Sequence, residues 1–403
     1  MAYKARIKNN ICTNAHPLGC YRNIYHDAQV ASAVSYAGPK MALVVGASSG
    51  IGLASRMSLA FGAGADTLGV YYERAAQAHK FGTAGWYNNQ GFEYFARRAG
   101  LNAYSTNQDA FQKNAKEWVI QRLKQLEKPL ELLVYSLAAP RRKVRGVGEF
   151  QSVIKPIKKP FDGLTVDVFE NKLREQHIEP ANTAEVDATV KVMGGEDWHD
   201  WVMTLQEAGV LAENFKTIAY SYLGPEQTQG IYGQGTLGSA KAHLHETSIA
   251  LNEKLRGTLN GEAKVGLYQA VVTPSSSVIP SMPLYLSIFH KTLKESGKYE
   301  SVMQQTNRMF AEGLYGDNES MRDGQYLRVD QIERDASVQA AVNQAYDQLA
   351  TAGLEQVADT QGFKQAFLQQ FGFGLDEVDY TDRPDPLLLP ATADFAPAER
   401  KIA

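Results

Sequence analysis

Residues 42–62 read ALVVGASSGIGLASRMSLAFG, and this stretch decides the fold. The apolar run at 42–46 is typical of a buried strand, whereas the apolar residues of 53–62 recur at helical spacing. Between them, a GxxxGxG turn runs from Gly46 to Gly52. Glycines let the backbone approach a pyrophosphate closely, and the free N–H groups at a helix start attract its negative charge. The stretch therefore predicts a dinucleotide-binding strand–turn–helix unit, the alternative being a turn that only packs the helix on the strand.

Strand and helix patterns alternate along most of the chain. Further strands are predicted at 67–72, 101–106, 130–138, 215–224 and 264–272, and the sheet is expected to end with the last of them. Helical patterns lie at 91–100, 111–127, 183–193, 196–209 and 236–255, and both 280–313 and 330–370 look mainly helical. Such alternation is typical of parallel strands joined by crossover helices. We therefore predict an α/β fold, a Rossmann-type doubly wound parallel sheet with helices on both faces, elaborated by insertions and extra C-terminal helices.

The whole chain, residues 1–403, is interpreted as a single elaborated domain of this type. Its cofactor-binding half is predicted at about 40–140, and its catalytic and substrate-binding part at about 215–313. The rhythm of the pattern breaks at about 139–183, where turn signals without a helical period predict an insertion of loops with room for a hairpin. The polar stretch 74–90 is predicted to be a loop.

Composition and charge exclude several classes of partner. Lys+Arg 41 against Asp+Glu 44 gives a net charge of −3, and because no Lys/Arg-rich block is typical of a nucleic-acid or membrane surface, we expect neither partner. The N-terminus lacks the apolar segment of a secretory signal, and no window reaches the ~18 apolar residues of a membrane span, so we expect a cytoplasmic protein. Cys12 and Cys20 are expected to be reduced thiols, and with His16 they lack the usual spacing of metal ligands. No metal is expected.

Carboxylates and a strand end lie where a nucleotide cofactor is expected. Glu73 ends the second strand, 21 residues after Gly52, where a carboxylate can accept hydrogen bonds from ribose hydroxyls. A carboxylate there repels a 2′-phosphate and favours NADH, although Arg74 offers the opposite pairing and Glu73 is alternatively a solvated loop acid. Asp109-Ala110 follows the third strand, where the carboxylate suits the adenine amino group or a helix cap equally well. Ser136-Leu137-Ala138 ends the fourth strand at the sheet's carboxyl edge.

Tyr232 and Lys241 form a candidate catalytic pair. A phenol held near a cationic lysine suits the stabilisation of an oxygen that becomes negative as hydride is transferred. On one continuous helix, nine steps of ~100° would place the two side chains on opposite faces, so the connection must bend. Gly233 and Gly235 allow that bend, which predicts Tyr232 in a loop and Lys241 in the second turn of the following helix. Tyr222, at a strand end, is a second phenol for the same cleft.

Both interpretations compete with ordinary structural roles. The chain has 20 tyrosines, and a lysine on a helix is usually only solvated. The apolar segment VVTPSSSVIPSMPLYLSIF at 271–289 suits an acyl-chain tunnel and core packing equally well.

Further motifs carry a resemblance to a known family. They are GADTLGVYYE at 64–73, GTAGWYN at 82–88, DAF at 109–111, VYSLAAPRRK at 134–143, VKVMGGEDW at 190–198, YSYLGPE at 220–226 and IPSMPLY at 279–285. Together with the wide Tyr-x8-Lys spacing, they resemble the FabV-type enoyl-acyl-carrier-protein (ACP) reductases and the related trans-2-enoyl-CoA reductases, large monomeric relatives of the short-chain dehydrogenases/reductases. The resemblance extends from about residue 16 to 380. The family often has tyrosine at the position of Ile51 and TQAS at 273–276.

This resemblance implies a function and a set of site residues. The chain would reduce the trans-2 double bond of an enoyl thioester, as in the last step of fatty acid elongation, with Tyr232 as proton donor, Tyr222 as substrate-binding residue and Lys241 as cofactor ligand. The NADH site would be formed by Gly46, Ala47, Ser48, Ser49, Gly50, Ile51, Tyr72, Glu73, Asp109, Ala110, Leu137, Ala138, Lys241, Val271, Val272 and Thr273. We expect a monomer that takes its substrate on ACP or, alternatively, on CoA. A nicotinamide-binding regulator without catalysis is the rival from another class.

Overall fold

The computed structural model describes residues 2–8 and 10–392. Within this part of the chain, eight strands form one sheet in the order β13-β14-β12-β11-β6-β3-β4-β5. Their bounds are β3 Met41–Val45, β4 Asp66–Tyr71, β5 Ala103–Asn107, β6 Leu130–Tyr135, β11 Leu211–Ser221, β12 Glu262–Leu267, β13 Arg322–Asp323 and β14 Tyr326–Arg328. All neighbours pair in parallel except β13, which is antiparallel to β14. The predicted parallel α/β sheet is confirmed.

Strand β3 shows why the sheet is covered on both faces. Successive side chains of a strand point to opposite faces. Met41, Leu43 and Val45 pack in one apolar core, whereas Ala42 and Val44 pack in another. All five side chains are almost completely buried, which explains the continuous apolar run in the sequence.

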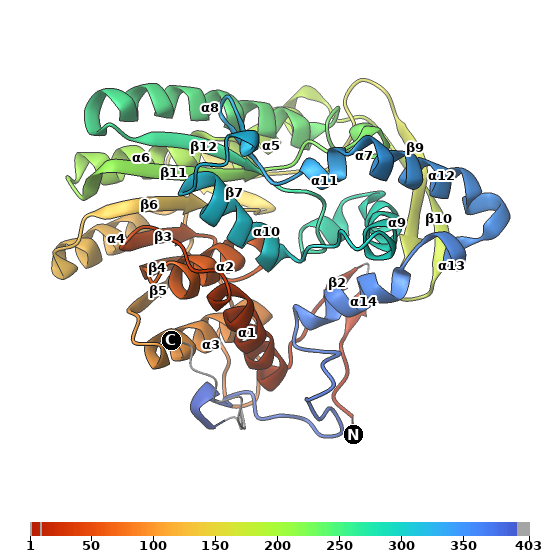
Figure 1. Cartoon of the computed structure of the whole chain (residues 1–403), viewed down its shortest axis with the longest axis horizontal. Coiled ribbons are helices and arrows are strands. Elements are labelled where there is room, and N and C mark those ends of the chain that lie inside the picture. The colour runs from red at the N-terminus through yellow and green to blue at the C-terminus, as the bar shows by residue number, and fades with distance from the viewer. Residues whose placement is uncertain (1, 9, 393–403) are drawn as a thin grey trace.

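Helices cover the two faces as the doubly wound prediction requires. One core includes side chains of α4 (Lys113–Leu126), α6 (Glu196–Glu207) and α8 (Thr236–Leu259). The opposite face packs against the π-helical turns η1 (Ser58–Gly62) and η3 (Met309–Leu314). Beyond it, a further core joins four helices, namely α1 (Pro17–Ser32), α2 (Gly50–Met57), α3 (Ala84–Arg98) and α10 (Val302–Arg308). In Figure 1, α8 lies above the strands and α1 below them.

A second assembly lies to the right of the sheet in Figure 1. It joins the hairpin of β9 (Phe161–Asp167) and β10 (Lys172–Ile178) to the helices α9 (Met282–Glu295), α12 (Ala336–Ala352), α13 (Leu354–Val357) and α14 (Thr360–Gln369). Leu284, Leu286, Ile288 and Phe289 are fully buried in its apolar core. For these residues of the 271–289 segment, core packing is therefore the correct interpretation.

Shorter elements complete the described chain. They are β1 Ile7–Lys8, β2 Ile11–Cys12, β7 Arg141–Val144, β8 Gly148–Gln151, α5 Thr183–Met193, α7 Glu226–Gln229, η2 Ser276–Val278, η4 Glu319–Met321, α11 Gln331–Arg334 and η5 Pro390–Thr392. The predicted insertion thus contains two hairpins, because β7 pairs with β8 as β9 pairs with β10. None of the helices in the described chain has the length and apolar character needed to cross a membrane.

Two sequence-based expectations about elements are wrong, and one helix was not predicted at all. The sheet does not end at β12, because β14 adds a further parallel strand beside it. Helix α3 begins at Ala84, inside the stretch 74–90 that was expected to be a loop. Its polar residues are buried with hydrogen-bond partners, since Asn88 Nδ2 donates to Ser48 O (3.0 Å) and Asn89 Nδ2 to Gly85 O (2.8 Å). Helix α1 lies in a region for which no helix was predicted.

Arg56 fixes α2 to the sheet from within the core. Its guanidinium donates to Thr67 Oγ1 (3.2 Å), Ser105 Oγ (2.9 Å) and Tyr104 O (2.8 Å) and lies over the ring of Phe92. Burial lowers the pKa of Arg56 to about 10. These bonds set where the first turn of α2, and with it the glycine-rich turn, meets the strand ends.

Candidate active site

A cavity of about 690 Å³ opens at the carboxyl edge of the sheet. The glycine-rich turn and the ends of β4, β5, β6, β11 and β12 border it. Strand β3 pairs with β4 on one side and with β6 on the other, so the strand order reverses here. Open α/β sheets bind ligands at such a switch point.

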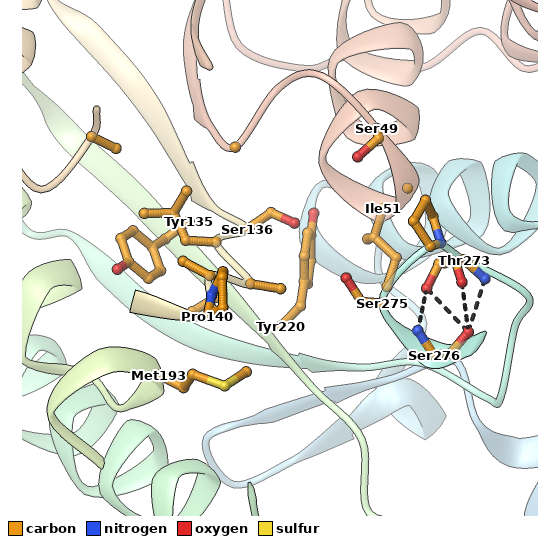
Figure 2. A pocket seen from close by; sticks show the side chains of 18 of the residues that line it. Ser49, Ile51, Tyr135, Ser136, Pro140, Met193, Tyr220, Thr273, Ser275 and Ser276 are labelled. Carbon is orange, nitrogen blue, oxygen red and sulfur yellow. Dashed lines mark hydrogen bonds between the residues drawn. The ribbon is translucent and has the colours of Figure 1, made fainter. Parts of the chain in front are cut away.

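The glycine-rich turn meets β6 at van der Waals limits. Gly46 has φ +93°, and a Cβ there would collide with the carbonyl oxygen of Ser136. A Cβ on Gly52 would collide with the oxygen of Gly46. Ser49, the N-cap of α2, makes no capping bond with its side chain, and the first N–H groups of a helix have no partner inside it. Figure 2 shows Ser49 and Ile51 at this helix start.

Two residues predicted for the cofactor site do not line the cavity. Ala47 is fully buried against the sheet, and its N–H donates a hydrogen bond to Val70 O at 3.1 Å. Val272 packs in the core around α9. Successive side chains point to opposite sides at these positions. Ala47 and Val272 therefore face apolar cores, whereas the residues next to them face the cavity. The other predicted site residues all border the cavity.

Glu73 is held in place by the neighbouring strand. Its N–H donates to Asn107 Oδ1 and its carbonyl accepts from Asn107 Nδ2, both at 2.8 Å. The carboxylate lies against Gly85 at the start of α3, where a Cβ would collide with it. Arg74, the residue that would favour a phosphate, is exposed and does not border the cavity. Tyr72 lies at the cavity rim with its side chain 76% exposed.

Asp109 stabilises the turn that precedes α4 while bordering the cavity. Its Oδ1 accepts from the N–H of Phe111 at 3.0 Å and its Oδ2 from Gln112 Nε2 at 3.3 Å. Asp109 is not the N-cap of α4, because the N-cap is Gln112, which has no side-chain capping bond. The other oxygen lone pairs remain for a ligand.

The Thr273–Ser276 turn closes the opposite wall (Figure 2). The N–H of Thr273 donates to Ser276 Oγ at 2.8 Å, and the N–H of Ser276 donates to Thr273 Oγ1 at 3.0 Å. The two hydroxyl side chains thus satisfy the backbone of the turn without help from a ligand. Pro274 and Ser275 between them border the cavity, and Figure 2 shows Ser275 beside Ile51.

Tyr232 and Lys241 lie on a bent connection, as their spacing requires. Tyr232 sits in the turn between α7 and α8, and its carbonyl oxygen accepts from the N–H of Gly238 at 2.9 Å. Lys241 lies in the second turn of α8, where its Nζ donates to Tyr220 O at 2.8 Å. Burial raises the pKa of Tyr232 and lowers that of Lys241 to about 8. The Tyr232 hydroxyl has no hydrogen-bond partner within the described chain.

Tyr222 packs its ring edge-on against Tyr232, with centroids 5.1 Å apart and an interplanar angle of 88°. Its hydroxyl donates to Glu333 Oε1 at 2.8 Å. Tyr285, which bonds the same oxygen at 2.7 Å, lies in the segment 271–289 that the sequence assigned to an acyl-chain tunnel or to core packing. Glu333 was missed by the sequence analysis. No local motif could have found it, because it reaches the site from α11, far along the chain from the last predicted strand.

The β7–β8 hairpin closes the side of the cavity near Asp109. Buried Arg142 donates to Lys191 O at 2.8 Å and pairs with Glu196 at 3.3 Å. Its neighbours Arg141 and Lys143 border the cavity. The contacts of Arg142 thus hold the hairpin in place, and its two neighbours add positive charge at the cavity wall.

His16, Cys12 and Cys20, the three residues with side chains able to bind a metal near the N-terminus, have other roles. His16 caps α1, accepting from the N–H of Gly19 on Nδ1 at 3.2 Å. Cys12 and Cys20 are buried free thiols. Over the described residues, no group of histidine, cysteine and carboxylate side chains has the arrangement of a metal site.

Comparisons with known proteins cover the chain in three parts. A family model described as "NAD(P)H binding domain of trans-2-enoyl-CoA reductase" matches residues 2–78, and one described as "Trans-2-enoyl-CoA reductase catalytic region" matches 80–315. A third, described as "Enoyl reductase FAD binding domain", matches 322–383.

Whole-length relatives agree with these models. An enoyl-[acyl-carrier-protein] reductase [NADH] of Burkholderia multivorans is 44% identical over 96% of this chain and 97% of its own, and one of Saccharophagus degradans is 45% identical over 94% and 97%. The crystal structure of Clostridium acetobutulicum trans-2-enoyl-CoA reductase in complex with NADH has a TM-score of 0.93 and 39% identity over 97% and 99% of the chains. That of the Treponema denticola enzyme in complex with NAD has a TM-score of 0.90 and 39% identity over 96% and 98%.

The segment 322–383 does not fit a flavin site. None of its residues borders the main cavity. Its apolar side chains, such as Val338, Val342 and Phe363, instead fill the core around α9. We therefore derive no flavin chemistry.

We predict that Gly46→Ala weakens NAD(P)H binding at least tenfold and lowers the melting temperature. Alanine at φ +93° costs about 1 kcal/mol in any left-handed position, and here its methyl group also collides with Ser136. Gly100→Ala is the matched control, because Gly100 has φ +77° with no atom within 4 Å of the new Cβ. Calorimetry and fluorescence titration measure both effects; equal losses in the two variants would contradict the close-contact role.

We also predict that Glu73→Gln tightens NADPH binding about tenfold relative to NADH, because the repulsion between its carboxylate and a 2′-phosphate is removed. The ratio of the two dissociation constants measures this. Glu117→Gln, on the exposed face of α4, is the control. An unchanged ratio in Glu73→Gln would show that Glu73 does not contact the ribose.

Proposed function

The chain belongs to the family of trans-2-enoyl-CoA reductases and NADH-dependent enoyl-ACP reductases, and on this basis we propose that it reduces the C2–C3 double bond of a trans-2-enoyl thioester with NADH. The observation that carries the proposal is one cavity bordered by the glycine-rich turn, Tyr232 and Lys241. We propose that the sheet with its helices and the assembly around α9 act together as a single reductase domain. We also propose that the protein is a cytoplasmic monomer.

The cavity residues suit NADH. The free N–H groups at the start of α2 would hold the pyrophosphate, and Glu73 the adenosine ribose hydroxyls. Lys241, half-buried and directed at the carboxyl edge of β11 by its bond to Tyr220 O, would bind the nicotinamide ribose. NADH, when bound, supplies the hydride for C3 of the substrate.

Tyr232 acts on the thioester oxygen. Its hydroxyl has no acceptor within the described chain, and burial keeps it protonated by raising its pKa. It donates a hydrogen bond to the carbonyl oxygen as negative charge develops there, which lowers the energy of the enolate. A solvent proton added at C2 then gives the saturated acyl thioester.

Lys241 supplies positive charge to the same region. Burial lowers its pKa to about 8, so it remains largely cationic at neutral pH. Inside the protein, where the effective dielectric constant is lower than in bulk solvent, this charge stabilises a nearby enolate more strongly. It therefore assists Tyr232 and binds the cofactor at once.

We predict that Tyr232→Phe lowers kcat at least a hundredfold on an enoyl thioester, because the hydrogen bond to the developing oxyanion is lost. The NADH dissociation constant and the melting temperature should remain close to wild type. Tyr299→Phe, remote from the cavity, is the matched control. Near-normal turnover by Tyr232→Phe would overturn the assignment of the proton donor.

The carrier of the acyl group separates the main proposal from its alternative. The sequence relatives at 44–45% identity act on ACP by name, which favours ACP, whereas the structural relatives at TM-scores of 0.90–0.93 are CoA enzymes by name. We predict a higher kcat/KM on crotonyl-ACP than on crotonyl-CoA. An equal or higher value on crotonyl-CoA would favour the CoA alternative.

A further inference from the structure

Glu333 is a buried carboxylate that contacts two phenols beside the active site. It lies in α11, 3% exposed. Its Oε1 accepts from the hydroxyls of Tyr222 (2.8 Å) and Tyr285 (2.7 Å). Its Oε2 accepts from the N–H of Ala270 at 2.8 Å, next to Val271 on the cavity wall.

A buried carboxylate in this position lowers the stability of the folded protein. Glu333 forms no ion pair in the part of the chain that the structure describes, and burying an unpaired charge is strongly unfavourable. Three hydrogen bonds partly offset that cost. Burial nevertheless raises the pKa of Glu333 to about 7, so it carries its charge only from neutral pH upward.

The direction of the Tyr222 hydrogen bond limits what Tyr222 can do. A phenol has one proton to donate, and Tyr222 donates it to Glu333. Toward the cavity it then offers its ring and oxygen lone pairs. Tyr232, whose hydroxyl has no partner in the described chain, keeps its proton for a substrate oxygen.

We propose that Glu333 is a positioning residue: it accepts the hydrogen bond of the Tyr222 hydroxyl, fixes the Tyr222 ring against Tyr232, and so leaves Tyr232 as the phenol that donates to the substrate. The inference rests on the proposed reduction of an enoyl thioester. The edge-on contact of the two rings, 5.1 Å between centroids, links Glu333 to Tyr232. If the Tyr222 ring rotates, the Tyr232 ring that packs against it is displaced.

Protonation of Glu333 disturbs this arrangement. A protonated carboxyl must donate its own proton, and the nearby oxygens able to accept it are those of Tyr222 and Tyr285. Either phenol then turns its proton elsewhere, and for Tyr222 that direction is the cavity. Activity should therefore fall as the pH decreases through about 7.

Several other titratable groups lie near Glu333. Asp330 is paired with Arg328 at 2.7 Å. His290, which faces the carbonyl of Ala270, has its pKa lowered to about 4 by burial. The two phenols have raised pKa values for the same reason. Lys241, whose pKa burial lowers to about 8, acts in the opposite sense, because activity falls when it loses its proton at higher pH. A loss of activity as the pH decreases through about 7 thus reports on Glu333.

The test compares wild type with Glu333→Gln between about pH 5.5 and 8, using NADH and one enoyl thioester. With a pKa of about 7, wild-type kcat/KM should be roughly thirtyfold lower at pH ~5.5 than well above pH 7. Glu333→Gln should lack this inflection and show about tenfold lower kcat at pH ~8, through loss of the charge-assisted bond. Its NADH dissociation constant should stay within about twofold of wild type. Glu319→Gln, an exposed carboxylate, is the matched control.

A second readout does not use activity. The native pKa of Glu333 lies above its unfolded value, so the native state binds the proton more tightly and stability falls as pH rises between the two values. The melting temperature of Glu333→Gln relative to wild type should therefore rise from pH ~5 to ~8. A constant difference would contradict the buried charge.

Tyr222→Phe provides a variant that keeps Glu333 and should fold. It lacks the hydroxyl through which Glu333 acts, so its pH inflection should also disappear. An inflection that persists in both variants would overturn the role of Glu333. If wild type itself reduces no enoyl thioester, the proposed function fails, whereas the melting data still decide the state of Glu333.

Discussion

The close contact between the glycine-rich turn and the end of β6 is the constraint on which the site depends. A side chain at Gly46 or Gly52 would collide with the backbone of Ser136 or of Gly46 itself. Only this approach places the start of α2 at the switch point of the sheet, where its free N–H groups face the cavity. The buried bonds of Arg56 hold α2 in the same position from behind.

The second half of the site depends on a bend rather than on a helix. The turn around Gly235 separates Tyr232 from α8, so the phenol and Lys241 reach one cavity. Loss of contact with water keeps the phenol protonated and lowers the pKa of the lysine. Glu333 adds a third buried group that decides where the neighbouring phenol of Tyr222 directs its proton.

The sequence predicted those features that local pattern determines. Glycine spacing, the apolar run of β3 and the nine-step separation of Tyr232 from Lys241 were sufficient for the sheet, the turn and the bend. Buried polar residues were misleading, because Asn88 and Asn89 look like loop residues until their partners are known. Contacts distant in sequence, such as β14 beside β12 or Glu333 beside Tyr222, leave no local signal. Backbone geometry decides which residues face the cavity, and the sequence alone does not show that Ala47 and Val272 face apolar cores instead.

The central claim is that the turn and the Tyr232–Lys241 connection form one site that delivers hydride to an enoyl thioester. The most direct measurement follows deuterium from NADH labelled at C4 of the nicotinamide ring into the product, by mass spectrometry and NMR. The account predicts one deuterium at C3 of the saturated acyl group and a solvent proton at C2. Label absent from C3, or NADH that binds tightly yet is not oxidised by any enoyl thioester, would contradict it.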